Sequence, residues 1–297
     1  MLLVTLVWGA TFVIVKDAVA RMPVMDFLAW RFLAAALVMV AVHPTRLRRL
    51  DGPAVGHGVV LGLAIGGGYV AQTFGLAIGT RASVSGFLTG MAVVFTPLFA
   101  GVLLRRRIGA LAWLAVAVAT AGLALTSLRG VSFGLGELLT LGCAACFALH
   151  ILGLSVWSRR YDSYALAVVQ IGTVGVVCLA VAAGQGLAAT TPHAHPQVWM
   201  ALAVTAVLAT AVGFLVQTWA QRHVSATRIA VVMTMEPVFA ALAALLYGER
   251  LGWASAVGGA MVLAAMYLVE LDPRRGPETE IAVHDLSEPP SGEPREP

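Results

Sequence analysis

The sequence predicts an all-α polytopic membrane protein with ten transmembrane helices, arranged as two inverted five-helix repeats. Three observations predict this fold class. Ten apolar stretches fill nearly all of the chain from Leu2 to Glu270, hydrophobic residues make up 59% of the 297 while charged residues make up 11%, and several residue pairs recur about 140 positions apart. Soluble domains carry about 25% charged residues. A soluble chain of this length would therefore lack the residues for a polar shell.

The apolar stretches are continuous rather than alternating, and this pattern predicts helices. In hydrocarbon every backbone polar group must be satisfied within the protein, which leaves helices or closed barrels. The predicted spans cover residues 2–20, 27–42, 56–78, 84–104, 109–127, 134–155, 163–183, 197–220, 228–247 and 252–270. The first span resembles a signal-peptide core, but no basic residues precede it and Lys16-Asp17 interrupts the approach to a cleavage site. We therefore expect an uncut first helix.

The arginines predict the orientation in the membrane. If the N-terminus is inside, twelve arginines lie on the inner side and four lie in outer loops, at Arg21, Arg81, Arg129 and Arg250. Positive residues are concentrated on the cytoplasmic side of membrane proteins. We therefore expect a multi-pass protein of the bacterial inner membrane with both termini in the cytoplasm. The basic residues are spread over short loops rather than gathered on one face, which argues against a nucleic-acid partner.

The two halves of the chain share residues in the same order. The matches are Trp8-Gly9 with Phe147-Ala148, Arg31 with Gln170, Gln72-Thr73-Phe74 with Gln217-Thr218-Trp219, and Thr96-Pro97 with Glu236-Pro237. A repeat of five spans inverts the second copy, and inverted repeats are typical of secondary transporters, whose substrate site lies between the copies near the middle of the membrane. We expect repeats over 1–130 and 131–270. Residues 271–297 form an acidic, proline-rich tail that we expect to be disordered.

Several motifs resemble the EamA-like transporters of the drug/metabolite transporter superfamily. These are Trp8-Gly9-Ala10-Thr11-Phe12, Trp30-Arg31-Phe32-Leu33-Ala34-Ala35, Gly136-Glu137-Leu138-Leu139, Glu236-Pro237-Val238-Phe239-Ala240 and Gly248-Glu249-Arg250-Leu251. The resemblance covers about residues 1–270. It implies an exporter of small metabolites, such as amino acids or drug-like amphipathic compounds, that works by alternating access around a central cavity. The chain departs from a symmetric pattern at Arg105-Arg106-Arg107, where the first repeat lacks a Gly-Glu-Arg of its own.

Ionisable groups at bilayer depth are costly and therefore point to function. Glu236 lies about seven residues into its predicted span and precedes Pro237, which would kink the helix. This carboxyl group could couple transport to protons, bind a cation, or be a neutral acid that bonds a neighbouring helix. His150 could relay protons or simply pack. Pro97 and Pro237 are the candidate gating residues.

Neutral polar and aromatic residues complete the predicted cavity. The cavity set comprises Trp8, Tyr69, Gln72, Thr89, Thr96, His150, Gln170, Gln217, Trp219 and Glu236. Polar stripes of this kind either line a wet cavity or join helices, and the aromatic residues either form a wall for an amphipathic solute or face lipid. We expect a small-molecule solute and the bilayer as partners, and no cofactor. The sequence leaves the oligomeric state open.

A few other groups are interpreted structurally. We expect Arg31 to reach the outer surface or pair with Asp17 or Asp26, with a substrate carboxylate as the alternative partner, and we expect Lys16 to pair with Asp17. Cys143 and Cys146 put two small residues on one helix face, and His193 with His195 are too few for a metal site. Two other functions stay open: a membrane enzyme for lipid-linked substrates, and a scaffold or sensor with the tail as its effector arm.

Overall fold

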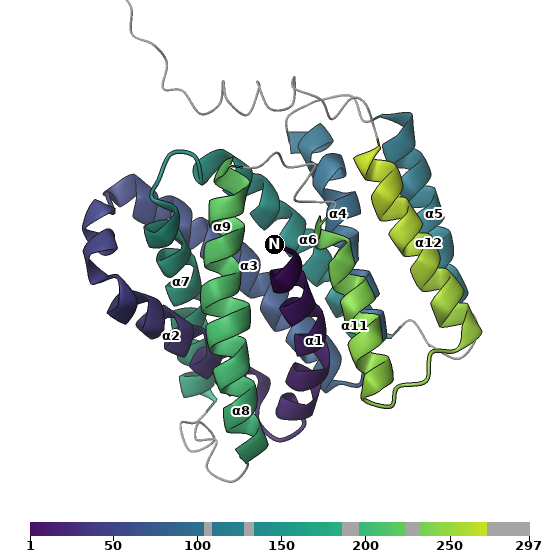
Figure 1. The fold of residues 1–297 in the computed structure, drawn as a ribbon, viewed down its shortest axis with the longest axis horizontal. Coiled ribbons are helices and arrows are strands. Elements are labelled where there is room, and N and C mark those ends of the chain that lie inside the picture. Colours follow the sequence, from purple (N-terminus) through teal and green to yellow (C-terminus); the bar gives the residue numbers. More distant parts are fainter. Residues whose placement is uncertain (104–108, 128–133, 186–195, 224–231, 272–297) are drawn as a thin grey trace, which may run out of the picture.

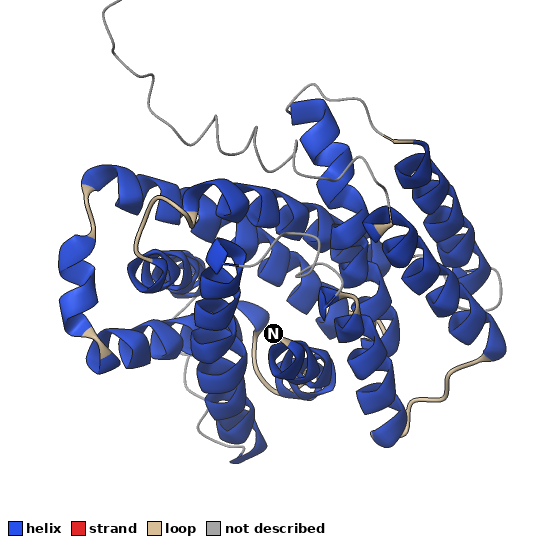
Figure 2. Cartoon of the chain, turned by 45° about the horizontal axis from the view of Figure 1, so that its top comes forward, coloured by secondary structure: helices blue, strands red, loops and turns tan. Residues whose placement is uncertain are grey.

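The structure is a computed structural model that describes residues 1–103, 109–127, 134–185, 196–223 and 232–271. All of the regular elements in these ranges are helical, as Figures 1 and 2 show. The elements are α1 (Leu2–Val19), α2 (Val24–Val42), η1 (Pro44–Arg49), α3 (Gly52–Ala77), α4 (Ala82–Leu103), α5 (Ala110–Ser127), α6 (Leu135–Trp157), α7 (Ser163–Gly184), α8 (Pro196–Val204), η3 (Thr205–Val212), α9 (Gly213–His223), α11 (Met235–Leu246) and α12 (Trp253–Glu270).

Within the described ranges, seven helices are long and apolar enough to cross a membrane, with α8, η3 and α9 counted together. Three shorter apolar helices cover Trp113–Gly122, Met235–Leu246 and Trp253–Leu268. The chain is therefore a multi-pass membrane protein. The loop with His193 and His195, the Arg105-Arg106-Arg107 run, the start of the ninth predicted span at 228–231 and the tail from 272 lie outside the described residues.

The starts of α2 and α3 lie at cap residues that the hydrophobic pattern does not show. The Asp51 carboxylate accepts a hydrogen bond from the Ala54 N–H at 2.7 Å, and α3 starts at Gly52, four residues before the predicted span. Pro23 is the N-cap of α2, which begins three residues earlier than predicted. Arg31 consequently lies two turns inside α2 rather than one.

Helices from the two halves of the chain pack against each other throughout. Figure 1 shows α5 beside α12 at one end of the bundle, and α2 near α7 at the other. Between them α3 packs on α6 and α1 packs on α11. The largest group of buried apolar side chains joins α2, α3 and α7, and a second joins α4, α5 and α12.

Glycines let these helices approach closely. A Cβ atom on Gly86 would lie 2.5 Å from the Ala240 Cβ, and one on Gly90 would lie 3.1 Å from Met266, so this Gly-x-x-x-Gly is a close contact between helices. Gly68 faces the Phe147 ring in the same way, so the glycine run in α3 is a tightly packed point.

Two expected ion pairs are wrong. Lys16 lies 3.6 Å from the Glu249 carboxylate rather than pairing with Asp17, which pairs with Arg21. Arg31 does not reach the surface: it is 2% exposed, and its Nε donates to the Thr210 Oγ1 at 2.9 Å. Both differences arise because the partners are distant in sequence.

Candidate functional site

A cavity with polar and aromatic side chains on its walls lies among α1, α3, α6, α9 and the start of α11. Its walls are Trp8, Thr11, Phe12, Ile65, Tyr69, Gln72, Phe147, His150, Ile151, Phe214, Gln217, Met233 and Glu236. The cavity volume is about 40 Å³. Since one water needs about 10–15 Å³ by this measure, the space equals roughly three waters. Six of the ten predicted cavity residues line it: Trp8, Tyr69, Gln72, His150, Gln217 and Glu236.

Helical spacing explains why these side chains meet. Each helix contributes residues three or four positions apart, which share one face: Ile65, Tyr69 and Gln72 on α3, and Phe147, His150 and Ile151 on α6. The lining residues come from both halves of the sequence. The cavity is therefore formed where the two halves pack together.

Glu236 lies at a break between helical segments. The chain makes a turn at Thr234, and α11 begins at Met235, so Glu236 is in the first turn and Pro237 follows it. The predicted kink at Pro237 is thus an interruption three residues earlier. The free N–H groups at a helix N-terminus favour an anionic side chain. The Glu236 side chain is half-buried and faces the cavity.

A glycine on α1 allows the approach that encloses Glu236. A Cβ atom on Gly9 would lie 2.6 Å from the Phe239 Cβ and 2.8 Å from the Glu236 carbonyl oxygen. The α1 backbone therefore touches the first turn of α11 directly. This contact places Trp8 and Glu236 in the same cavity.

Gln72 is held by residues behind the cavity wall. Its Nε2 donates to the Thr89 Oγ1 at 2.9 Å and lies 3.7 Å from the Cys143 Sγ. Thr89 is thus a partner of a lining residue, and is not on the wall itself. Thr96 bonds the Ala92 carbonyl oxygen of its own helix at 2.7 Å and also lies off the wall.

His150 has a fixed orientation because of Gln170. The Gln170 Nε2 donates to the Leu166 carbonyl oxygen at 3.2 Å, which leaves its Oε1 to accept from the His150 Nε2 at 2.7 Å. Both side chains are fully buried. Gln170 therefore lies behind His150, and it sets which ring nitrogen carries the proton.

The aromatic part of the wall differs in composition from the expected set. Trp219 is 54% exposed and its ring lies 4.7 Å from the His223 ring, away from the cavity. The ring centroids of Phe147 and Phe214 lie 5.3 Å and 6.1 Å from that of Tyr69. Sequence reasoning missed both phenylalanines as wall residues, although Phe147 is the counterpart of Trp8 in the repeat.

A π-helix holds the wall from outside. The Trp8 Nε1 donates to the Ala209 carbonyl oxygen at 2.7 Å, and Thr210 accepts from Arg31. Both acceptors belong to η3, whose π-helical geometry is often found at functional sites. Arg31 also lies 4.8 Å over the Tyr69 ring. The apolar run Thr205–Val212 gives no sign of this segment in the sequence.

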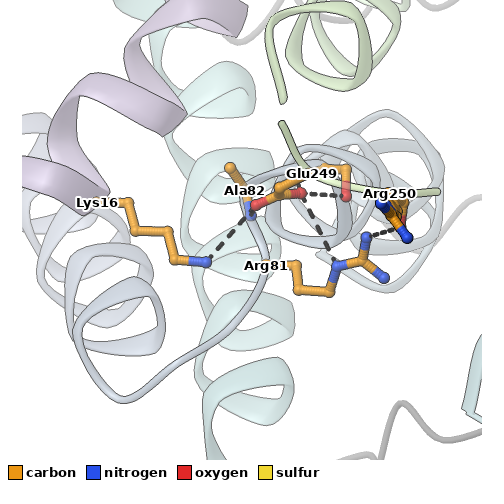
Figure 3. Close-up of polar contacts among 6 residues, drawn as sticks. Lys16, Arg81, Ala82, Glu249 and Arg250 are labelled. Atoms are coloured by element: carbon orange, nitrogen blue, oxygen red, sulfur yellow. Dashed lines mark hydrogen bonds and ion pairs between the residues drawn. The ribbon is translucent and has the colours of Figure 1, made fainter. Parts of the chain in front are cut away.

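A second polar group lies where the end of α1, the start of α4 and the loop after α11 meet. We call it the Glu249 cluster, and it comprises Lys16, Arg81, Ala82, Ser83 and Glu249. The Glu249 carboxylate accepts hydrogen bonds from the Ala82 N–H at 2.9 Å, the Ser83 N–H at 3.3 Å and the Ser83 hydroxyl at 2.8 Å. It lies 3.6 Å from the Lys16 ammonium and 3.9 Å from the Arg81 Nε (Figure 3). The carboxylate thus caps α4 from a distant part of the chain.

Two glycine turns bring the Glu249 cluster together. Gly79 (φ 112°) ends α3 and Gly248 (φ 87°) ends α11, a conformation that favours glycine. The Thr80 N–H then bonds the Gly75 carbonyl oxygen, and the Glu249 N–H bonds that of Ala244, the pattern of a Schellman cap.

The charge state of Glu249 follows from these contacts. Burial alone would raise the pKa of the Glu249 carboxyl, but the hydrogen bonds from Ala82 and Ser83 and the Lys16 charge outweigh it. They hold the pKa below its usual value of 4.5. The group is therefore ionised at neutral pH.

Long apolar helices around a polar cavity define the chain as a polytopic membrane protein with a small internal site. The EamA-like transporter family matches residues 1–128 and 134–271. A relative from Archaeoglobus fulgidus named "Uncharacterized transporter" is 30% identical over 271 residues, which cover 91% of this chain and 84% of the relative. A solved structure described as "Crystal structure of protein" has a TM-score of 0.63 at 19% identity, and the match covers 92% of this chain and 96% of that chain.

The chain belongs to the EamA-like transporter family, as its motifs predicted. It is therefore a membrane transporter of the drug/metabolite transporter type. The likeness to the solved structure supports the helical fold and says nothing of the solute.

Proposed function

We propose that the protein is a secondary transporter that moves a small solute by alternating access around the cavity between its two halves. The observation that carries the proposal is the shared wall: Trp8 and Gln72 come from the first half, and His150, Gln217 and Glu236 from the second. When two bodies rock against each other, a site at their interface opens to one side and then to the other. No motion within one half is needed.

Ten spans in two inverted repeats, over residues 1–130 and 131–270, are part of this proposal. The pairing of helices supports them, with α1, α2, α3, α4 and α5 corresponding to α6, α7, α8–α9, α11 and α12. The contact of α4 with α6 has its counterpart in α11 with α1, and the contact of α3 with α7 has its counterpart in η3 with α2. A two-fold relation between the halves would produce such matched contacts.

The size of the cavity supports movement as part of the mechanism. About 40 Å³ is far below the roughly 300–1,000 Å³ of sites for drug-sized ligands. A solute larger than a few atoms would enter only if the halves separate. The Glu249 cluster joins the ends of α1 and α4 to the loop after α11, so it would hold one end of the cavity closed.

Direction and location complete the proposal. The protein would lie in a bacterial inner membrane, and the arginine distribution supports cytoplasmic termini. In that orientation the Glu249 cluster would lie on the outer side. Export is the direction that the family resemblance implies. Glu236 is the group that would exchange protons if transport uses a proton gradient.

The test is solute counterflow in reconstituted vesicles, with a panel of labelled amines, amino acids, neutral alcohols and organic acids, and with and without a pH gradient. We expect saturable exchange of at least one class, and loss or uncoupling of exchange in Glu236→Gln. Asp17→Asn, which removes an exposed carboxylate, is the matched control and should keep wild-type flux. Exchange of none of the panel would contradict the transport proposal. Full activity of Glu236→Gln with an unchanged pH dependence would remove Glu236 from the mechanism.

A further inference from the structure

We infer that the cavity selects a small cation that carries N–H donors, such as a primary ammonium group. This inference rests on the proposed function and names the class of solute. It follows from the hydrogen-bonding groups on the wall. Four side-chain donors, on Trp8, Thr11, Gln72 and His150, bond groups within the protein, whereas two buried acceptors and a carboxylate lack a partner among the described residues.

His150 supplies the first acceptor. Gln170 can only accept from the His150 Nε2, because its own amide nitrogen donates to Leu166. The proton is therefore on Nε2, and Nδ1 carries a lone pair. Nδ1 is buried and has no hydrogen-bond partner among the described residues. A buried acceptor without a donor is costly, so a solute that donates to Nδ1 when the two halves separate would satisfy it.

Gln217 supplies the second acceptor. Its side chain is 2% exposed, lines the cavity, and leaves Oε1 without a partner in the part of the chain that the structure describes. His150 lies on α6 and Gln217 on α9. Two residues that line one small space, on different helices, therefore each carry a buried acceptor without a partner among the described residues.

Glu236 supplies the charge. No hydrogen bond or ion pair to its carboxylate occurs within the described ranges. Arg31, a buried cation in the same region, is not on the wall and donates to Thr210 instead. A carboxylate at bilayer depth needs a partner. A cationic solute would provide it.

The donors on the wall are largely used by other groups. The Trp8 Nε1 donates to Ala209, the Thr11 hydroxyl donates to the Trp8 carbonyl oxygen, and the Gln72 amide donates to Thr89. The Tyr69 hydroxyl and the Gln217 amide are the remaining side-chain donors on the wall. An anionic solute that used them would still face the Glu236 carboxylate. The inventory therefore disfavours anions.

The remaining wall suits a cation of limited size. The rings of Tyr69, Phe147 and Phe214 lie together on it, and aromatic faces attract a cation within about 6 Å. The space of about 40 Å³ fits a head group of a few heavy atoms. A primary ammonium with a short chain meets each of these conditions.

Binding to the purified protein in lipid nanodiscs, measured by isothermal titration calorimetry at neutral pH, tests the inference with four probes that share a two-carbon chain. Ethanolamine carries the charge and N–H donors, choline carries the charge without N–H donors, ethylene glycol is neutral, and glycolate is an anion. We expect saturable ethanolamine binding at least tenfold tighter than that of the other three. Glu236→Gln should weaken it at least tenfold and His150→Phe several-fold, while Asp17→Asn should leave it unchanged.

Each other result overturns the inference. Absent ethanolamine binding, or equal binding of ethylene glycol or glycolate, refutes the cation class, and equal binding of choline refutes the role of the two acceptors. If a variant fails to fold, the comparison of the four probes on the wild-type protein still tests the inference. Counterflow separates this inference from the proposed function. If only a neutral or anionic solute is exchanged, the protein is a transporter and the inferred cation class is refuted. If ethanolamine binds but no solute is exchanged, the cation class stands and the transport proposal is refuted.

Discussion

Replacing Glu249 with alanine should destabilise the protein by detaching α4 from the loop after α11. The Glu249 carboxylate accepts from two backbone N–H groups in the first turn of α4, at Ala82 and Ser83, and from the Ser83 hydroxyl. These N–H groups have no partner within their own helix. The variant therefore leaves helix donors without an acceptor and removes a link between distant segments.

The magnitude follows from the contacts. Loss of an N-terminal cap costs about 0.5–2 kcal/mol, and each half-exposed ion pair adds about 0–1 kcal/mol. Since Glu249 caps two N–H groups and lies near Lys16 and Arg81, we expect about 2–3 kcal/mol for Glu249→Ala. Glu249→Gln keeps one acceptor and should cost about 1 kcal/mol. At about 2–4 °C per kcal/mol, the alanine variant should unfold about 4–12 °C lower.

The assay is thermal unfolding in detergent, followed by tryptophan fluorescence, together with hydrogen exchange at the start of α4. Asp162→Ala is the matched control, because Asp162 caps α7 through Tyr164 and Ala165 but is adjacent to that helix in sequence. The control should lose comparable stability without faster exchange in α4. A Glu249→Ala protein that unfolds within about 1 °C of wild type would refute the reasoning.

The pH dependence gives an independent check. The pKa of Glu249 is below its usual value of 4.5, so the folded state binds this proton less tightly than the unfolded state does. The stabilisation from Glu249 is therefore complete above the usual value and is lost as the pH falls below it. The stability gap between wild type and Glu249→Gln should narrow between neutral pH and about pH 3.5. A constant gap would mean that the carboxylate charge contributes nothing.

Two further substitutions test the packing around the cavity. Gly9→Ala places a methyl group against Phe239, and it should lower stability by about 1–3 kcal/mol and reduce flux. Gly142→Ala is the control, because its methyl group meets no atom within 4 Å, and it should change neither quantity. Thermal unfolding measures the stability and counterflow measures the flux. Trp8→Phe leaves the Ala209 carbonyl oxygen of the π-helix without its donor, so we expect about 1–3 kcal/mol of lost stability and faster hydrogen exchange in η3; unchanged exchange there would contradict the role of this bond.

The sequence predicted that the chain is a membrane protein and where most of its helices lie, because hydropathy and span length can be read from neighbouring residues along the chain. It also placed Tyr69 and Gln72 on one face, and it marked Glu236 by the cost of a carboxylate in lipid. The family followed from short motifs. Helix starts were less accurate, since Asp51 and Pro23 act through cap geometry rather than hydrophobicity.

Partners distant in sequence depended on the tertiary structure. No local pattern relates Trp8 to the Ala209 carbonyl oxygen, Arg31 to Thr210, or Glu249 to the first turn of α4. These contacts form only when the two halves pack together. The partners are backbone groups or a single hydroxyl group, and such groups occur at many positions along the sequence. The sequence by itself determined that polar groups lie within the membrane. The packing of the helices decided which of them meet in one cavity and which buried acceptors lack a partner among the described residues.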